Sequence, residues 1–202
     1  MARADAAAAA SPLRGLAATF TYAQARRAGI SDRTLYRLRD TGVIQQVGHG
    51  MYRRTDIEIA ADLDLLEIAQ RAPQATLCLT TALARHGLTD EIPASIDVAL
   101  PRGLHRPITA APVTWHLFDP DSFGVGRTEL VLDEHTTVGL YSPERSIIDA
   151  IRLRHREGPE LGYVALKRWL SRPGSSPAEL LALARRFPQA EKALREALEI
   201  LL

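Results

Sequence analysis

The sequence predicts an α+β protein in which an N-terminal winged helix-turn-helix precedes a larger mixed α/β domain. Three observations lead to this class: two short helical patterns with a hairpin pattern in the first sixty residues, alternating β-branched segments in the middle, and amphipathic helical patterns at the end. A chain of 202 residues accommodates two small domains. We expect a disordered leader over residues 1–14, the winged helix-turn-helix over 15–56 and the α+β domain over 57–202.

Two helix starts lie close together near the N-terminus. Thr21 and Gln24 have the spacing of a capping box, in which each side chain satisfies a backbone N–H group of the other residue. Gly29 is expected to end this first short helix. Ser31 in "GISDRTLYRLRD" is the expected N-cap of the next one. Two helices joined by a glycine-containing turn predict a helix-turn-helix.

The second helix has an apolar and a basic face. Leu35 and Leu38 are three residues apart and are expected to point inward. Arg33 and Arg37 are four apart and share a different face, which Thr34 and Tyr36 flank. This basic face is expected to enter the major groove of DNA, where arginine side chains contact base edges.

A hairpin pattern follows the second helix. In "VIQQVGHGMYRR", apolar residues stand on both sides of a turn expected at Gly48–Gly50. A hairpin directly after a recognition helix is a wing, whose His49, Arg53 and Arg54 are expected to contact the DNA backbone or the minor groove. The candidate DNA-contacting residues are Arg26, Arg27, Ser31, Arg33, Thr34, Arg37, His49, Arg53 and Arg54.

The charge distribution agrees with this division. Residues 1–56 hold nine arginines and four aspartates, a formal charge of +5, while the whole chain carries only +1. The remaining residues, 57–202, therefore carry −4. A basic small domain joined to a mildly acidic larger one is typical of a nucleic-acid-binding domain attached to a domain with another task.

Several motifs together resemble a known family. "AGISDRTLYRLRDTGVIQQVGHGMYR" is similar to the N-terminal winged helix of the AbiEi-type antitoxins, the transcriptional regulators of type IV toxin–antitoxin modules. Further along, "TTALARHGLTDEIPASIDVALPRG", "YSPERSIIDAIRLRHREG" and "LGYVALKRWL" follow in the same order as in that family. The resemblance covers almost the whole chain after about residue 15.

The resemblance implies a function. AbiEi-type antitoxins bind inverted repeats in the promoter of their own operon and repress it, and they counteract a co-encoded nucleotidyltransferase-like toxin. The expected partners are therefore promoter DNA and such a toxin. We expect a monomer or weak dimer in solution and two copies on an inverted repeat. Neither direct toxin contact nor its absence follows from the sequence.

The larger part alternates strand and helix patterns. "SIDVALP", "VTWHLFD" and "ELVLDEHTTVGLYS" predict strands. Ser142 and Ser176, each followed by proline, predict helix starts. A connecting helix is expected to begin near Asp56, with Ile59, Leu63, Leu66 and Ile68 facing inward.

No pattern of an enzyme is present in the sequence. The histidines lack metal-ligand spacing, and neither a phosphate-binding Gly-rich loop with lysine nor a G-x-S-x-G turn occurs. Asp97 lies on an expected strand, where metal-dependent nucleases carry a carboxylate, but a matching acidic–lysine pair is missing. We therefore expect no catalysis, cofactor or metal. Two alternatives stay open: a ligand-sensing repressor without a toxin, and a nuclease-like enzyme with a DNA-binding domain.

Three further features complete the expectations. Arg145 and Asp149 are expected to pair along one helix, with the arginine fixing a loop against it. The basic loop "PRGLHRP" is a second candidate for contacting DNA or a partner. The lone cysteine, Cys78, is expected to be a buried apolar residue. With no signal peptide or membrane span, these features favour a cytoplasmic protein.

Overall fold

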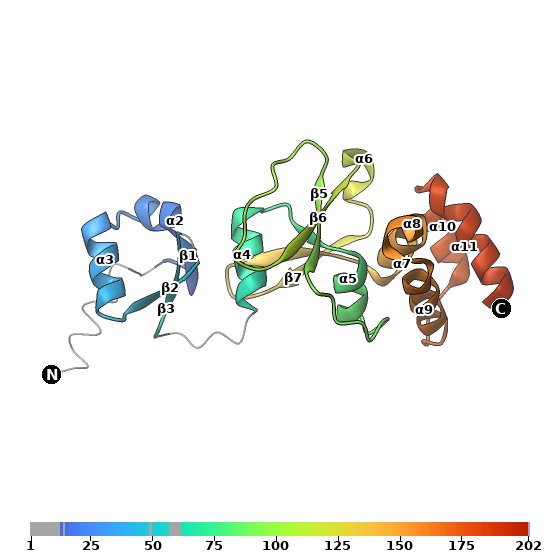
Figure 1. Ribbon diagram of the computed structural model, residues 1–202, viewed down its shortest axis with the longest axis horizontal. Coiled ribbons are helices and arrows are strands. Elements are labelled where there is room, and N and C mark those ends of the chain that lie inside the picture. The colour runs from blue at the N-terminus through green and yellow to red at the C-terminus, as the bar shows by residue number, and fades with distance from the viewer. Residues whose placement is uncertain (1–12, 14, 49, 57–61, 202) are drawn as a thin grey trace. The chain divides into compact units, whose positions relative to one another are not determined.

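The computed structural model describes residues 13, 15–48, 50–56 and 62–201, and it confirms a mixed α+β protein with two sheets (Figure 1). The chain divides into two compact units. Unit 1 comprises Met1–Pro73, Pro107–Ala110 and Val131–Val138. Unit 2 comprises Gln74–Arg106, Ala111–Leu130 and Gly139–Leu202. The domain boundary expected after residue 56 stays a prediction.

The described residues of unit 1 form a small antiparallel sheet and three helices. Its elements are β1 (Thr19–Thr21), α2 (Tyr22–Arg27), α3 (Asp32–Asp40), β2 (Ile44–Gly48), β3 (Met51–Arg54) and α4 (Leu63–Arg71). The strands are ordered β1-β3-β2, so that the hairpin β2–β3 follows α3 and β1 pairs with its second strand.

Local sequence signals position α2 and α3 as expected. The capping box is present, with the Thr21 hydroxyl accepting a hydrogen bond from the Gln24 backbone and the Gln24 side chain accepting one from the Thr21 backbone. Gly29 has a φ of +83°, a conformation that glycine adopts without the steric cost of a side chain. Ser31 caps α3 by accepting a hydrogen bond from the Thr34 backbone.

The core of unit 1 lies between α2, α3 and the sheet. Leu35 and Leu38 are buried in it, as predicted, together with Phe20 and Tyr52, whose rings stack with centroids 5.9 Å apart. Leu13 is also fully buried there, although the sequence placed it in a disordered leader. The other residues of that expected leader lie outside the described residues.

Helix α4 corrects one prediction. It begins at Leu63, with Asp62 as its N-cap, rather than near Asp56, which lies in a bend. The Asp62 carboxylate accepts hydrogen bonds from the backbone of the first turn and so fixes the start of the helix at this position. Leu66 and Ile68 are buried as expected, whereas Ile59 lies outside the described residues.

Polar contacts attach α4 within unit 1. The Gln70 amide donates to the Thr19 carbonyl at 2.7 Å. The buried Glu67 carboxylate accepts from the Ala110 backbone at 2.9 Å and from Arg71 at 2.7 Å. These bonds hold the short segment Pro107–Ala110 against the helix.

A mixed five-stranded sheet is formed by strands between Thr76 and Tyr141. Its strands are β4 (Thr76–Leu77), β5 (Ile96–Pro101), β6 (Val113–Phe118), β7 (Arg127–Val131) and β8 (Thr137–Tyr141). The order is β6-β5-β4-β8-β7, with β5 parallel to β6, β4 antiparallel to β5, and β4 parallel to β8. The strand predictions for this region are confirmed.

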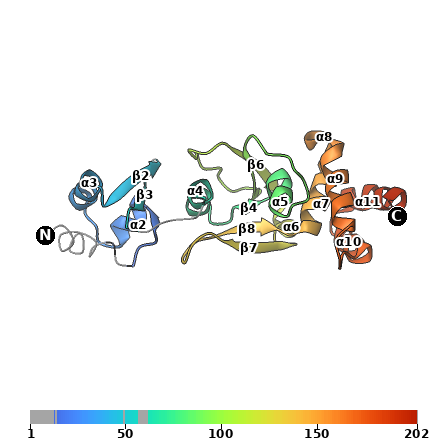
Figure 2. The same cartoon turned by 90° about the horizontal axis from the view of Figure 1, so that it is seen from below.

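Helices of unit 2 gather around α7, mostly toward the C-terminal end of the chain (Figure 2). They are α5 (Leu79–Arg85), α6 (Pro120–Phe123), α7 (Pro143–Arg152), α8 (Arg154–Glu157), α9 (Pro159–Leu170), α10 (Pro177–Ala184) and α11 (Pro188–Leu201). Ser142 and Ser176 cap α7 and α10, as predicted. Among the described residues, no helix combines the length and the hydropathy that crossing a membrane requires.

Candidate nucleic-acid interface

Helix α3 presents a basic face to solvent because its apolar residues face the core. Leu35 and Leu38 are buried, while Arg33 and Arg37 on the other side are exposed. Within the described part of the chain, neither guanidinium forms a hydrogen bond or an ion pair. Both arginines therefore keep all their donors available for an anionic or acceptor-rich partner.

The first turn of α3 is ordered by hydroxyl groups. The Ser31 and Thr34 hydroxyls lie 2.9 Å apart, and Ser31 also caps the helix. Thr34 is half-buried and Ser31 is exposed. Ser31 and Thr34, both predicted to contact DNA, therefore already have a structural role at the start of α3.

Two further exposed side chains on α3 are missing from the predicted contact residues. Tyr36 is 47% exposed, and the Arg39 guanidinium lies 5.0 Å from the centre of its ring. Arg39 also pairs with Asp40 at 2.9 Å. Helical periodicity could have placed Tyr36 on the solvent side, because it follows Arg33 by three residues. Arg39 follows the buried Leu35 by four residues, so periodicity alone did not indicate its exposure.

The predicted pair on α2 divides into a tethered and a free arginine. Arg26 donates to the Ile30 carbonyl at 3.1 Å and lies 3.6 Å from Asp32. Tyr22 also donates to Asp32, at 2.7 Å, and this bond to the carboxylate raises the pKa of Tyr22. Arg27 is exposed and has no side-chain partner among the described residues.

The two arginines of the β2–β3 hairpin differ in how firmly other residues hold them. Arg53 donates to the Gln45 amide oxygen at 2.8 Å and is half-buried. Arg54 is held more firmly, because it pairs with Asp56 at 2.7 Å and donates to the Leu13 carbonyl. The Arg54 guanidinium lowers the pKa of Asp56. His49 lies outside the described residues.

The candidate sites of unit 2 are built differently. Asp97 on β5 bonds to His116 on β6 at 3.0 Å, and both side chains are nearly inaccessible to solvent. In the described ranges no three His, Cys, Asp or Glu side chains are grouped as metal ligands would be. The other predicted feature, Cys78, is fully buried, and burial raises the pKa of its thiol.

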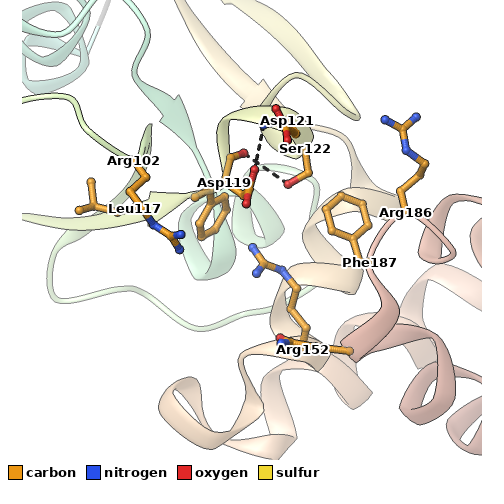
Figure 3. Close-up of a pocket in the computed structure, with 10 residues that line it drawn as sticks. Arg102, Leu117, Asp119, Asp121, Ser122, Arg152, Arg186 and Phe187 are labelled. Carbon is orange, nitrogen blue, oxygen red and sulfur yellow. Dashed lines mark hydrogen bonds between the residues drawn. The ribbon is translucent and has the colours of Figure 1, made fainter.

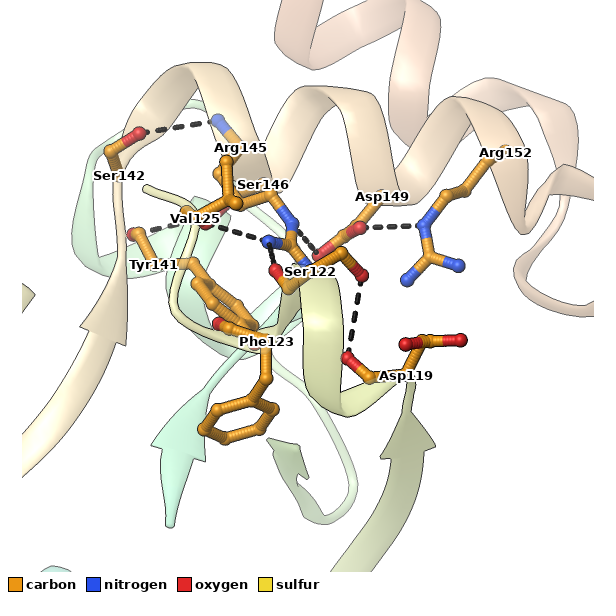
Figure 4. Close-up of polar contacts among 10 residues, drawn as sticks. All are labelled: Asp119, Ser122, Phe123, Val125, Tyr141, Ser142, Arg145, Ser146, Asp149 and Arg152. Atoms are coloured by element: carbon orange, nitrogen blue, oxygen red, sulfur yellow. Dashed lines mark hydrogen bonds and ion pairs between the residues drawn. The ribbon is translucent and has the colours of Figure 1, made fainter. Parts of the chain in front are cut away.

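The predicted pair of Arg145 and Asp149 is confirmed and extended (Figure 4). Arg145 is fully buried, bonds to Asp149 at 2.9 Å and donates to the carbonyls of Ser122 and Val125. The arginine therefore fixes the α6 loop against α7, as the sequence predicted. Arg152 binds the second carboxylate oxygen of Asp149 at 2.6 Å.

The geometry of the N-terminal residues defines a class. A small α+β unit with two capped helices, a hairpin and free arginines on the solvent face of the second helix is compatible with a small DNA-binding domain. Residues 15–55 match the family described as the AbiEi antitoxin transcriptional regulators. The predicted resemblance is confirmed over this segment of the chain.

The whole chain was also compared with solved structures and with curated proteins. The fold is similar to the crystal structure of the RV2827C protein from Mycobacterium tuberculosis, with a TM-score of 0.60 and 18% identity, over 95% of this chain and 76% of that chain. At this identity the similarity concerns the fold alone. Among curated proteins, none is significantly similar in sequence to this chain.

Proposed function

We propose that the protein is an antitoxin-type transcriptional regulator that binds inverted repeats in its own promoter and represses the operon. The observation that carries the proposal is the exposed face of α3, whose Arg33 and Arg37 have no partner among the described residues. The family match over residues 15–55 supports the same assignment. In this proposal α3 is the recognition helix and the β2–β3 hairpin is the wing of a winged helix-turn-helix.

The proposed contacts differ in what they contribute. Arg33 and Arg37 contact base edges in the major groove, where a bidentate arginine–guanine contact discriminates by about 1–3 kcal/mol. Thr34 and Ser31 lie at the N-terminal end of the same helix, whose positive dipole favours a phosphate. Such contacts fix the position of the helix on the duplex without selecting a sequence.

The arginines outside α3 contact phosphates in the proposal. Arg27 is the strongest candidate because it is exposed and unpartnered within the described residues. To bind a phosphate, Arg26 has to release the neutral Ile30 carbonyl, and Arg53 has to release the neutral Gln45 amide oxygen. Arg54 has to give up Asp56 and the Leu13 carbonyl, so we assign it mainly to holding the hairpin end.

Two copies of the chain bind one inverted repeat in this proposal. Each chain carries one α3, and the two half-sites of an inverted repeat are related by a twofold axis, so each half-site takes one helix. A monomer or weak dimer in solution suffices, since the DNA itself brings the two copies together.

Unit 2 serves the second task of an antitoxin, counteracting a nucleotidyltransferase-like toxin, and does so without catalysis. The buried bond between Asp97 and His116 supports a structural rather than a metal-binding role for this carboxylate. A divalent-metal cleavage assay with wild type and Asp97→Ala tests this point. Cleavage by wild type that the variant lacks would favour the nuclease alternative instead.

The DNA-binding proposal is tested by titrating the protein onto its own upstream DNA and onto scrambled DNA over a salt series. Tight, sequence-selective binding that Arg33→Ala/Arg37→Ala abolishes is the expected result. Binding that is equally weak on both DNAs and lost at modest salt contradicts the proposal, because such binding reflects counterion release alone.

The antitoxin proposal needs its own experiment. Co-expression with a nucleotidyltransferase encoded beside the gene is expected to restore growth, and Arg33→Ala/Arg37→Ala is expected to lose repression while growth is still restored. If no such neighbour exists, the ligand-sensing repressor is the better assignment. That alternative is favoured by one observation, the arginine-lined pocket of unit 2.

A further inference from the structure

Unit 2 contains a pocket that no step of the proposed function uses (Figure 3). Its volume is about 540 Å³, within the range of about 300–1,000 Å³ that small-molecule sites occupy. Three arginines and two aromatic rings line it: Arg102 after β5, Arg152 at the end of α7, Arg186 after α10, Phe118 and Phe187. Segments far apart in the sequence therefore bring three guanidinium groups to one concave site.

Two of these arginines have no counter-charge of their own. Arg102 and Arg186 are exposed, and no hydrogen bond or ion pair joins either side chain to another described residue. In Figure 3 the guanidinium groups of Arg102 and Arg152 point toward one another across the pocket, whereas that of Arg186 points away. The pocket therefore presents the guanidinium groups of Arg102 and Arg152 to an anion between them, and Arg186 lines its edge.

The third arginine is held in place before any ligand arrives. Arg152 uses only its Nε to bind Asp149, and its guanidinium lies 4.5 Å from the centre of the Phe118 ring. Asp149 in turn is fixed by the buried Arg145. The terminal nitrogens of Arg152 make no hydrogen bond with a described residue, so they stay available as donors on a side chain that has little freedom left to lose.

Two carboxylates also line the pocket, and they limit what can bind. Asp119 accepts a hydrogen bond from the Asp121 backbone at 2.9 Å, and both residues line the pocket. A ligand with a single negative charge gains little from three guanidiniums that face two carboxylates. A phosphate group carries more charge and several acceptor oxygens, which match the forked donors of two arginines.

We propose that this pocket binds a phosphate monoester, presented either by a free nucleotide or by the phosphorylated end of a nucleic acid. Arg102 and Arg152 bind the phosphate oxygens, and Arg186 adds charge at the rim. The proposal does not depend on promoter binding by unit 1, because every lining residue belongs to unit 2.

The experiment compares two double variants that remove the same charge. Arg102→Gln/Arg186→Gln removes the unpartnered lining arginines, and Arg106→Gln/Arg185→Gln removes exposed neighbours that do not line the pocket. The probes are pyrophosphate, AMP and a single-stranded oligonucleotide with a 5′-phosphate, the last in an Arg33→Ala/Arg37→Ala background so that α3 does not contribute. Thermal unfolding is followed by tryptophan fluorescence, which reports on unit 2 because Trp115 and Trp169 both lie there.

A bound probe is expected to raise the unfolding temperature in a saturable manner at constant ionic strength. The lining variant should weaken this binding by about tenfold or more, and the neighbouring variant should not. Tighter binding of AMP than of the oligonucleotide identifies a nucleotide site, and the reverse identifies a nucleic-acid site. The proposal is overturned if no probe binds at millimolar concentration, or if both variants weaken binding equally.

Discussion

Two arginine-containing pairs with the same helical spacing have opposite environments. Arg33 and Arg37 are four residues apart on α3, exposed and without described partners. Arg145 and Asp149 are four apart on α7 and fully buried, with every nitrogen of Arg145 but Nη2 bonded within the described residues. The spacing sets only which side chains share a face. What the face meets decides whether an arginine holds the fold or remains free to bind a partner.

The largest expected effect comes from the buried member of this comparison. Arg145→Ala leaves Asp149 with only Arg152 and removes the guanidinium donor from the Ser122 and Val125 carbonyls. Removing one partner of a buried ion pair costs about 3–5 kcal/mol. The free energy of unfolding of unit 2, measured in urea, should therefore fall by that amount. Tryptophan fluorescence measures it, and Arg33→Ala is the control with no expected change. A loss below about 1 kcal/mol would show that water replaces Arg145 at little cost.

The second prediction concerns the space that Arg145 occupies. Gly126 has a φ of +68°, and a Cβ on it would lie 2.7 Å from the Cβ of Arg145. Gly126→Ala should therefore add steric overlap, about 1–3 kcal/mol, to the backbone strain of about 1–2 kcal/mol. Gly174→Ala is the matched control, since its φ is +84° and nothing lies within 4 Å. Equal losses of unfolding free energy in the two variants would mean that the contact with Arg145 yields readily.

The third prediction addresses the exposed pair. Arg33→Ala and Arg37→Ala should each weaken promoter binding by about 1–3 kcal/mol and leave the unfolding free energy within about 0.5 kcal/mol of wild type. Arg39→Ala is the comparison on the same helix, because its guanidinium already pairs with Asp40. Gel-shift titration measures the affinities. If Arg39→Ala has the larger effect, α3 meets DNA with a different face.

These contrasts show which parts of the structure were predictable from the sequence. The caps Thr21, Ser31, Ser142 and Ser176 were found because a cap depends on residues within one turn. The complete burial of Arg145 could not be found, because it depends on the Ser122 and Val125 carbonyls, which are distant in the sequence. The bond between Arg152 and Asp149 was missed although the two residues are only three apart on α7, a spacing that the sequence shows. The burial of Leu13 was missed because the other buried residues of its cluster come from five elements that follow it along the chain.

The pocket of unit 2 was equally invisible in the sequence. Arg102 was noticed as part of a basic loop, but Arg152 and Arg186 gave no signal that they approach it. A convergence of three arginines from three segments requires the sheet order and the packing of α7 and α10. No local pattern contains that information.

The fourth prediction lies in the start of α3. Ser31→Ala removes the hydroxyl that accepts from the Thr34 backbone and should cost about 1 kcal/mol of unit 1 stability. Because both tryptophans lie in unit 2, amide hydrogen exchange of α3 is the suitable measurement. Ser176→Ala, the corresponding cap of α10, should leave exchange in α3 unchanged.

The smallest expected effect is a pH dependence at the end of the hairpin. The Arg54 guanidinium lowers the pKa of Asp56, so the pair stabilises unit 1 fully above the ordinary pKa of an aspartate. That contribution is lost as the pH falls through the lowered value, because the carboxyl group then takes up a proton in the folded state. Asp56 is 43% exposed, so the stabilisation amounts to about 0–1 kcal/mol. Asp56→Asn should remove this dependence of hairpin amide exchange below about pH 4, whereas Asp40→Asn on α3 should preserve it. Identical pH profiles for wild type and Asp56→Asn would mean that the Leu13 carbonyl, rather than Asp56, holds Arg54 in place. Arg54 would then be released toward DNA more easily than its geometry indicates.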